Sequence, residues 1–188
     1  MANRDNRSWQ SRARIADLAA RYMAEHGIRD YGLAKRKAVR QLGLPDGHGM
    51  PSNEEVDAAL IQRQDLYEPE EQAATLDALR QQALAVMGVF ERFEPVLTGA
   101  VASGAVSENS LVELEINVDS SKEFEQQLHN AGIGFKIQDK GGRMAYLLYA
   151  EPADVLVRLV PFEPHRTHGA ARARLTRAQL DRLMAARG

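Results

Sequence analysis

The sequence contains no cysteine among its 188 residues. This excludes disulfide frameworks, thiolate zinc sites, iron-sulfur clusters and a cysteine nucleophile. The sequence also has no apolar run near the roughly 20 residues that a helix needs to cross a bilayer. Its first residues, MANRDNRSWQSRAR, lack the apolar core of a secretory signal. These absences predict a cytoplasmic protein without a membrane partner.

What is present is ordinary for a globular domain: 44% of the residues are hydrophobic and 27% are charged, with a formal net charge of -2. The charges are segregated, however. Residues 1–44 carry +6, residues 45–95 carry -8, residues 96–164 carry -5 and residues 165–188 carry +5. Two basic ends therefore flank an acidic middle, which is compatible with a polyanion partner or with ends that pair with the chain's own middle.

Apolar residues recur every three or four positions in the first half of the chain, which predicts helices over about residues 8–26, 30–42, 52–66 and 69–93. In the second half the period changes to two, as in LVELEINV, which predicts strands over residues 96–100, 111–118, 133–138, 144–150 and 155–160. A short helix after Ser120 and a last helix opened by Thr176 complete an α+β fold. We expect a helical arm over residues 1–68, an α+β domain over residues 69–164 and a basic C-terminal helix over residues 165–188.

Acidic residues at alternate positions mark the strand expected over residues 111–118. Carboxylates at positions i and i+2 share one face of a strand and can hold a divalent metal together, and Glu113 and Glu115 have that spacing. Asp154, at the start of VLVRLV, is the best placed third acid on a neighbouring strand. The alternatives are a solvated strand face for the two glutamates and a turn residue for Asp154.

The segment from residue 98 to residue 118, TGAVASGAVSENSLVELEINV, resembles the nucleotidyltransferase superfamily. The hallmark of that superfamily is a strand ending in Gly-Ser, a variable turn, and a strand reading Asp-hydrophobic-Asp or Glu-hydrophobic. In the favoured register Ala100 replaces the motif serine, Leu111 replaces the first metal-binding acid and Glu113 takes the place of the second. A shift of two residues aligns Glu113 and Glu115 with the acidic pair instead.

The run LAKRKAVRQLG, followed by a loop and PSNEEVDAAL, is similar to small proteobacterial proteins with a nucleotidyltransferase-like C-terminal part. The resemblance implies a helical N-terminal region and a small mixed sheet with flanking helices. It also implies a nucleoside triphosphate bound with Mg²⁺, which Glu113, Glu115 and Asp154 would hold as catalytic and metal residues. The nucleotide contacts that it implies lie in and after the small-residue turn: Gly99, Ala100, Ser103, Gly104 and Ser110. Because the motif is degenerate at Leu111, the resemblance implies weak or no nucleotidyl transfer.

A second interpretation comes from the basic run on the helix expected over residues 30–42. Clustered cations on one helix face can contact successive phosphates, and the candidates are Lys35, Arg36, Lys37 and Arg40. A solvated or internally paired face is the alternative. This interpretation describes a non-catalytic module that binds nucleic acid or an acidic protein through its basic helix and C-terminal tail, with the sheet available for homo-oligomer formation.

Overall fold

The structure is a computed structural model that describes residues 2–45, 49–67, 69–107, 109–118, 120–139, 144–160 and 173–186, without the side chains of residues 2–8, 65, 67 and 69. The chain divides into two compact units. Unit 1 comprises Met1–Gln72 and Gly104–Asn109, and unit 2 comprises Ala73–Ser103 and Ser110–Gly188. Of the helices in the described ranges, none is both long enough and apolar enough to cross a membrane.

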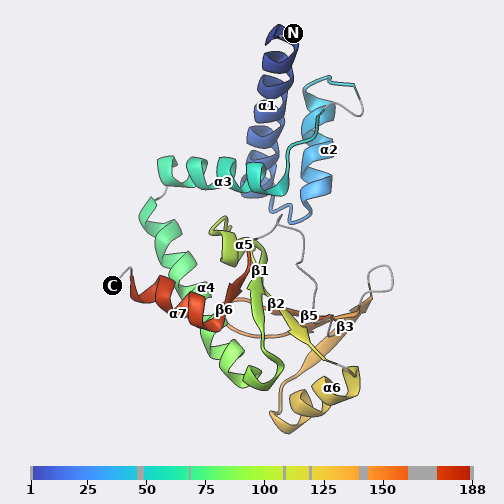
Figure 1. The fold of residues 1–188 in the computed structure, drawn as a ribbon, viewed down its shortest axis with the longest axis vertical. Helices are drawn as coiled ribbons and strands as arrows, with labels where there is room; N and C mark the ends of the chain where they lie inside the picture. The colour runs from blue at the N-terminus through green and yellow to red at the C-terminus, as the bar shows by residue number, and fades with distance from the viewer. Residues whose placement is uncertain are drawn as a thin grey trace. The chain divides into compact units, whose positions relative to one another are not determined.

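Unit 1 is built on three helices: α1 (Ala2–His26), α2 (Tyr31–Gln41) and α3 (Asn53–Tyr67). Both α2 and α3 contact α1 (Figure 1). Their apolar stripes meet in one buried cluster, and its fully or nearly fully buried members include Ile15, Ala19, Ala38, Val56 and Leu60. The three helices expected here from apolar periodicity are therefore confirmed, with α1 beginning earlier than its stripe.

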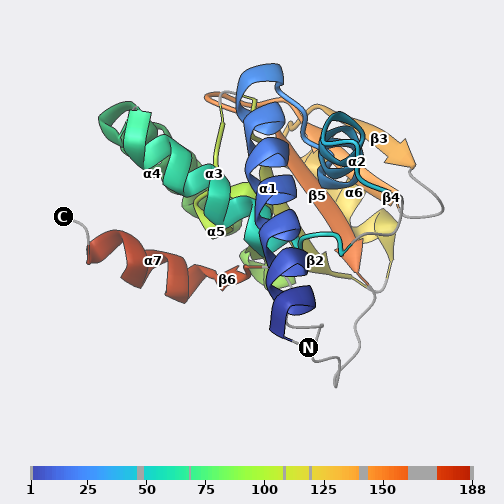
Figure 2. The ribbon, with the colours of Figure 1, turned by 90° about the horizontal axis from the view of Figure 1, so that it is seen from above.

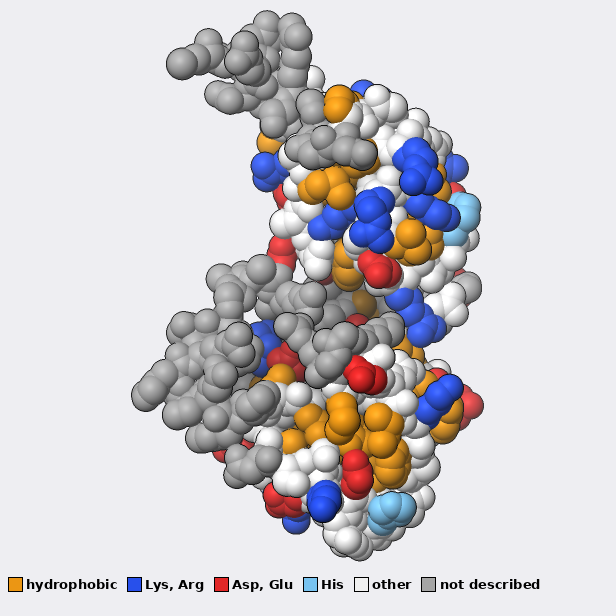
Figure 3. All heavy atoms as spheres, turned by 90° about the vertical axis from the view of Figure 1, so that its right-hand side faces the viewer, with side chains coloured by type: hydrophobic (Ala, Val, Ile, Leu, Met, Phe, Trp, Pro, Cys, Tyr) orange, Lys and Arg blue, Asp and Glu red, His pale blue; other side chains and the backbone are white. Residues whose placement is uncertain are grey.

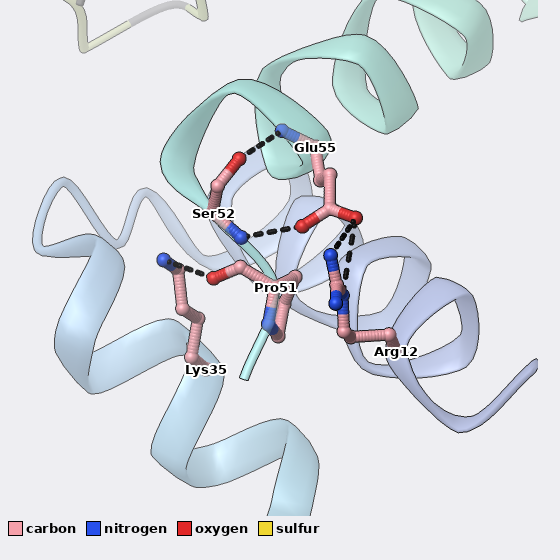
Figure 4. A network of polar contacts seen from close by, with 5 residues as sticks. All are labelled: Arg12, Lys35, Pro51, Ser52 and Glu55. Atoms are coloured by element: carbon pink, nitrogen blue, oxygen red, sulfur yellow. Dashed lines mark hydrogen bonds and ion pairs between the residues drawn. The ribbon is translucent and has the colours of Figure 1, made fainter. Parts of the chain in front are cut away.

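Side-chain caps fix where two of these helices begin. The Asp30 carboxylate accepts a hydrogen bond from the Leu33 amide at 2.9 Å and caps α2. Before α3, the Ser52 hydroxyl accepts from the Glu55 amide and the Glu55 carboxylate accepts from the Ser52 amide, at 3.1 and 2.6 Å (Figure 4). This reciprocal pair is a capping box, which satisfies amide donors that the first turn of a helix leaves unpaired.

Unit 2 holds a mixed sheet of six strands in the order β3-β4-β5-β2-β1-β6. The strands are β1 (Val96–Thr98), β2 (Val112–Asn117), β3 (Phe135–Asp139), β4 (Met144–Leu148), β5 (Val155–Val160) and β6 (Leu175–Thr176). Strand β2 runs parallel to β5 and antiparallel to β1. The helices are α4 (Pro69–Val89), which starts within the last residues of unit 1, then α5 (Gly99–Ser103), α6 (Ser121–Asn130) and α7 (Arg177–Ala185), with a short 3-10 helix at Glu91–Phe93. The expected α+β architecture is confirmed.

One face of this sheet, the inner face, forms the core of unit 2. Val112, Leu114 and Ile116 alternate along β2 and have no exposed surface. The Phe124 ring of α6 contacts Phe90, which follows α4, and Tyr146 of β4, with ring centroids 5.2 Å apart in both pairs. The end of α4 and helix α6 therefore cover the inner face (Figure 1). By alternation, the polar residues of β2 lie on the opposite face, which we call the outer face.

Two elements of unit 2 differ from the sequence prediction. Residues 99 and 100, expected at the end of a strand, begin α5 instead, because Gly99 leaves the extended region with φ +70°. Strand β6 was not expected: Leu175 and Thr176 pair with β1 at the sheet edge away from β3 (Figure 2). Thr176 then caps α7 through a complete capping box with Gln179, as predicted.

Candidate functional site

The connection from β1 into α5 brings the backbone against a glutamate of β2. Gly99 has a positive φ, which favours glycine. A Cβ atom at this position would lie 2.8 Å from Cδ of Glu113, closer than real Cβ contacts come. Glycine therefore suits this position through its conformation, and the Glu113 carboxyl group, the far end of a flexible side chain, occupies the space where a Cβ atom would lie.

Glu113 and Glu115 share the outer face of β2, as their spacing predicted. Glu113 lies opposite Thr98 of β1 and Leu156 of β5, and Glu115 lies opposite Val96 and Arg158. The Glu113 side chain is 27% exposed and that of Glu115 is 14% exposed. Both carboxylates are thus held on a rigid sheet and remain in contact with water.

Each of these glutamates has an arginine partner. Arg158 Nη1 of β5 donates to Glu113 Oε2 at 2.5 Å, and Arg174 Nη1, just before β6, donates to Glu115 Oε2 at 2.5 Å. The arginine side chains are 33% and 30% exposed, so Arg158 is nearly as buried as Glu113, whereas Arg174 is about twice as exposed as Glu115. Sequence reasoning did not single out either arginine. Arg158 occupies a polar position in the otherwise apolar VLVRLV, a signal that could have identified it, whereas Arg174 has no such mark.

The third predicted acid, Asp154, lies just before β5. Its backbone carbonyl accepts from the Val112 amide at 3.2 Å, so it lies beside position 111, where the superfamily motif has its first acid. Its carboxylate accepts from the Ala150 amide at 3.4 Å and closes the turn over residues 150–154. The structure therefore shows the turn role for this carboxylate, and its metal role stays a prediction.

The predicted nucleotide contacts are distributed along the connection from β1 to β2. Ala100 and Ser103 belong to α5, where the Ser103 hydroxyl donates to the Ala100 carbonyl at 3.2 Å. Gly104 has φ +93° and belongs to unit 1, while Ser110 is half-buried and returns to unit 2. Their role in nucleotide binding stays a prediction.

The carboxylate oxygens of Glu113 and Glu115 on the outer face are of the type that binds magnesium ions. Mg²⁺ is usually bound through one or two carboxylates together with substrate phosphates and water, and Glu113 with Glu115 can supply such a pair. Within the described ranges, no three His, Asp or Glu side chains lie close enough to hold a metal ion by themselves. A metal held here would therefore need further oxygen ligands besides these two carboxylates.

The basic helix α2 is only partly the surface that the sequence suggested. Lys35 was expected on the exposed face, but this is wrong, because its side chain is buried. Its ammonium donates to the Pro51 carbonyl at 2.7 Å (Figure 4). It also donates to Asn53 Oδ1 at 2.7 Å. Burial lowers the pKa of Lys35, against the opposing effect of nearby acids, Glu54 first. Lys35 thus ties α2 to the start of α3.

The other three basic residues of α2 are exposed. Arg36, Lys37 and Arg40 all lie on the surface of the helix, and the Lys37 ammonium is 5.6 Å from the centre of the Tyr22 ring. Figure 3 shows Lys and Arg side chains gathered on this side of unit 1. We call these three residues the α2 basic patch. The predicted basic surface on α2 is therefore present, but it consists of Arg36, Lys37 and Arg40 and does not include Lys35.

Comparison with known proteins finds partial structural similarity. No protein-family model matches the chain, and no curated protein matches it. A mutant of the Cid1 poly(U) polymerase bound to MgATP is similar over 45% of this chain and 32% of its own length, with 17% identity and a TM-score of 0.36. A cytoplasmic RNA terminal U-transferase is similar over 48% of this chain and 28% of its own length, with 24% identity and a TM-score of 0.30. The chain thus spans about a third of the length of these structures.

Proposed function

We propose that the protein binds a nucleoside triphosphate with Mg²⁺ on the outer face of unit 2, and that its nucleotidyl transfer activity is weak or absent. The observation that carries this proposal is the fit between Gly99 and Glu113. The Glu113 carboxyl group lies where a Cβ atom on Gly99 would project, and Glu115 lies two residues further along the same face. A close-approach turn beside two carboxylates is what a triphosphate and its metal require.

Each residue of the proposed site would have a separate role in binding the nucleotide and its metal. Glu113 and Glu115 would hold the metal, which supplies positive charge to the phosphates. The backbone from Gly99 to Ser103 would lie along the triphosphate, and Asp154 would be the additional acid. Phosphoryl transfer depends almost entirely on positioning and charge stabilisation, and Leu111 offers neither a ligand nor a charge at the position of the first motif acid. Binding with little transfer is therefore the expected outcome.

Calorimetry tests this proposal directly. The protein is titrated with ATP, CTP, GTP and UTP, each with Mg²⁺, at protein concentrations able to detect millimolar binding. We expect heat with at least one nucleotide and at least a tenfold weaker affinity in the double variant Glu113→Gln, Glu115→Gln. The matched control is Glu123→Gln, because Glu123 is also paired with an arginine, Arg92 at 2.8 Å, but lies on α6. Absence of heat with all four nucleotides would refute the proposal.

A second candidate function rests on the α2 basic patch. Three exposed cations within five residues of one helix can contact phosphates of a nucleic acid, and such contacts make binding weaken steeply with salt. The same patch would suit an acidic protein. The observation that favours this candidate is the exposure of Arg36, Lys37 and Arg40 on one helix.

A gel shift with single- and double-stranded nucleic acids at two salt concentrations tests the second candidate. We expect a salt-dependent shift that disappears when the three patch residues are replaced by glutamate. The control variant carries the same number of charge reversals at exposed basic positions of unit 2: Arg92, Lys136 and Arg182. Equal mobility of the wild type and the patch variant would exclude nucleic-acid binding by α2.

A further inference from the structure

The outer face of unit 2 carries two ion pairs of the same kind, and they concern the two carboxylates of the proposed site. Glu113 is held by Arg158 from the neighbouring strand β5, and Glu115 is held by Arg174 from the segment before β6. Both pairs have an N–O distance of 2.5 Å, and all four side chains are partly exposed. The proposed ligand oxygens are thus already neutralised by protein cations.

An arginine keeps its positive charge at every pH at which the protein is folded. Each guanidinium therefore places a fixed charge beside the oxygen atoms to which a divalent cation would bind. Glu113 and Glu115 can accept a cation only if Arg158 and Arg174 move away or if additional negative charge arrives. All four side chains keep some contact with water, and a partner that binds the arginines can offset the cost of separating the pairs.

A triphosphate is such a partner. The guanidinium group presents planar pairs of N–H donors that match phosphate oxygens, often with two hydrogen bonds. If Arg158 and Arg174 turn to the phosphates, Glu113 and Glu115 become free to accept a cation that the same phosphates also bind. In this exchange the arginines pair with the phosphates and the glutamates pair with the cation, so that every charge keeps a partner. Neither the triphosphate alone nor the cation alone would achieve this.

We infer that Arg158 and Arg174 make cation binding at Glu113 and Glu115 depend on the nucleotide: they hold the carboxylates when the site is empty and transfer to the phosphates when a triphosphate binds. This inference rests on the proposed nucleotide site and adds to it an order of events. Cation and nucleotide bind cooperatively, and the two arginines are the positioning residues that couple them.

The test uses MnCl₂ as the probe and the free Mn²⁺ signal in electron paramagnetic resonance as the readout, on the full chain. Wild-type protein is titrated without nucleotide and with each of the four nucleoside triphosphates, after subtraction of the Mn²⁺ that the nucleotide binds in the absence of protein. We expect Mn²⁺ affinity without nucleotide to be at least tenfold weaker than with the nucleotide that binds. Equal affinity under both conditions would overturn the inference.

Substitutions of Arg158 and Arg174 distinguish the effect of their positive charge from the effect of their side-chain shape. In the Arg158→Gln, Arg174→Gln variant, Mn²⁺ without nucleotide should bind at least tenfold more tightly than in the wild type, because the competing charges are gone. The Arg158→Lys, Arg174→Lys variant keeps the charge and should bind Mn²⁺ as weakly as the wild type. Arg92→Gln, which unpairs Glu123 elsewhere on unit 2, should change nothing. Circular dichroism verifies that each variant is folded.

The outcomes distinguish the two proposals. If the wild type binds nucleotide with Mn²⁺ but the Gln variant shows wild-type affinity for Mn²⁺ alone, the arginine inference fails and the nucleotide site stands. If the lysine variant binds Mn²⁺ as tightly as the Gln variant, charge is not the cause and the inference also fails. If neither the wild type nor any variant binds Mn²⁺ or a nucleotide, the proposed function itself fails.

Discussion

The stability of unit 2 should fall at alkaline pH because of the hydroxyl group of Tyr146. This side chain has no exposed surface, and its hydroxyl donates to Glu125 Oε1 at 2.6 Å. Burial first, and then the hydrogen bond to Glu125, raise the pKa of Tyr146 from 10.0 to about 12. A pKa that is higher in the folded state gives a contribution that is complete below pH 10 and is lost as the pH rises toward 12. At pH 11 the loss amounts to about 1.4 kcal/mol of unfolding free energy.

Urea unfolding at pH 8 and pH 11, followed by circular dichroism, measures this loss. The Tyr146→Phe variant should be less stable than the wild type at pH 8 by about 1.5 kcal/mol, because it lacks a hydrogen bond to a charged group. Between pH 8 and pH 11 it should lose about 1.4 kcal/mol less than the wild type loses. Tyr149→Phe is the control, because the Tyr149 side chain is 62% exposed. An equal loss in the wild type and in Tyr146→Phe would refute the reasoning.

Two further predictions compare matched pairs of residues. Lys35→Met should lower the unfolding free energy of unit 1 by about 2 kcal/mol, because two hydrogen bonds from a charged donor are lost. The control Lys37→Met, on the exposed side of the same helix, should change it by less than about 0.5 kcal/mol. Equal effects of the two variants in urea unfolding would contradict the buried role of Lys35. Gly99→Ala and Gly132→Ala both place a side chain at a positive φ, which lowers the unfolding free energy by about 1–2 kcal/mol. Of these two positions, only at Gly99 would the new Cβ atom also meet the Glu113 side chain. Gly99→Ala should therefore be the more destabilising of the two and should also weaken nucleotide binding in calorimetry, and equal effects would show that the close approach is unimportant.

Local signals in the sequence correctly predicted several features that depend on near neighbours. The capping boxes of Ser52 with Glu55 and of Thr176 with Gln179 join residues three positions apart, and both are present. The alternation along β2 also placed Glu113 on the outer face correctly. In each of these cases the pattern and the interaction span the same few residues, so that no tertiary information was needed.

The sequence was insufficient where distant segments meet, and where a short or charged local pattern allowed more than one interpretation. Arg174 and Glu115 are 59 residues apart, and no local pattern relates them. The five-residue helix α5 is too short to show a period, and a small-residue segment is compatible with a turn, a strand end or a helix. Lys35 was misplaced because its charge was weighed above its position: it lies one turn before Val39, in the buried stripe of α2, and that spacing could have identified it.

The segregation of charge along the chain has a partly internal explanation. The basic C-terminal segment pairs with the acidic residues of its own unit, through Arg174 with Glu115 and Arg177 with Glu91. In unit 1, Arg12 likewise pairs with Glu55. A phosphate reaches a paired cation of this kind only by displacing its carboxylate, which is the exchange that we infer for Arg174 with a triphosphate. The exposed α2 basic patch, whose three cations lie on the helix surface, is therefore one surface on which nucleic-acid binding can be tested.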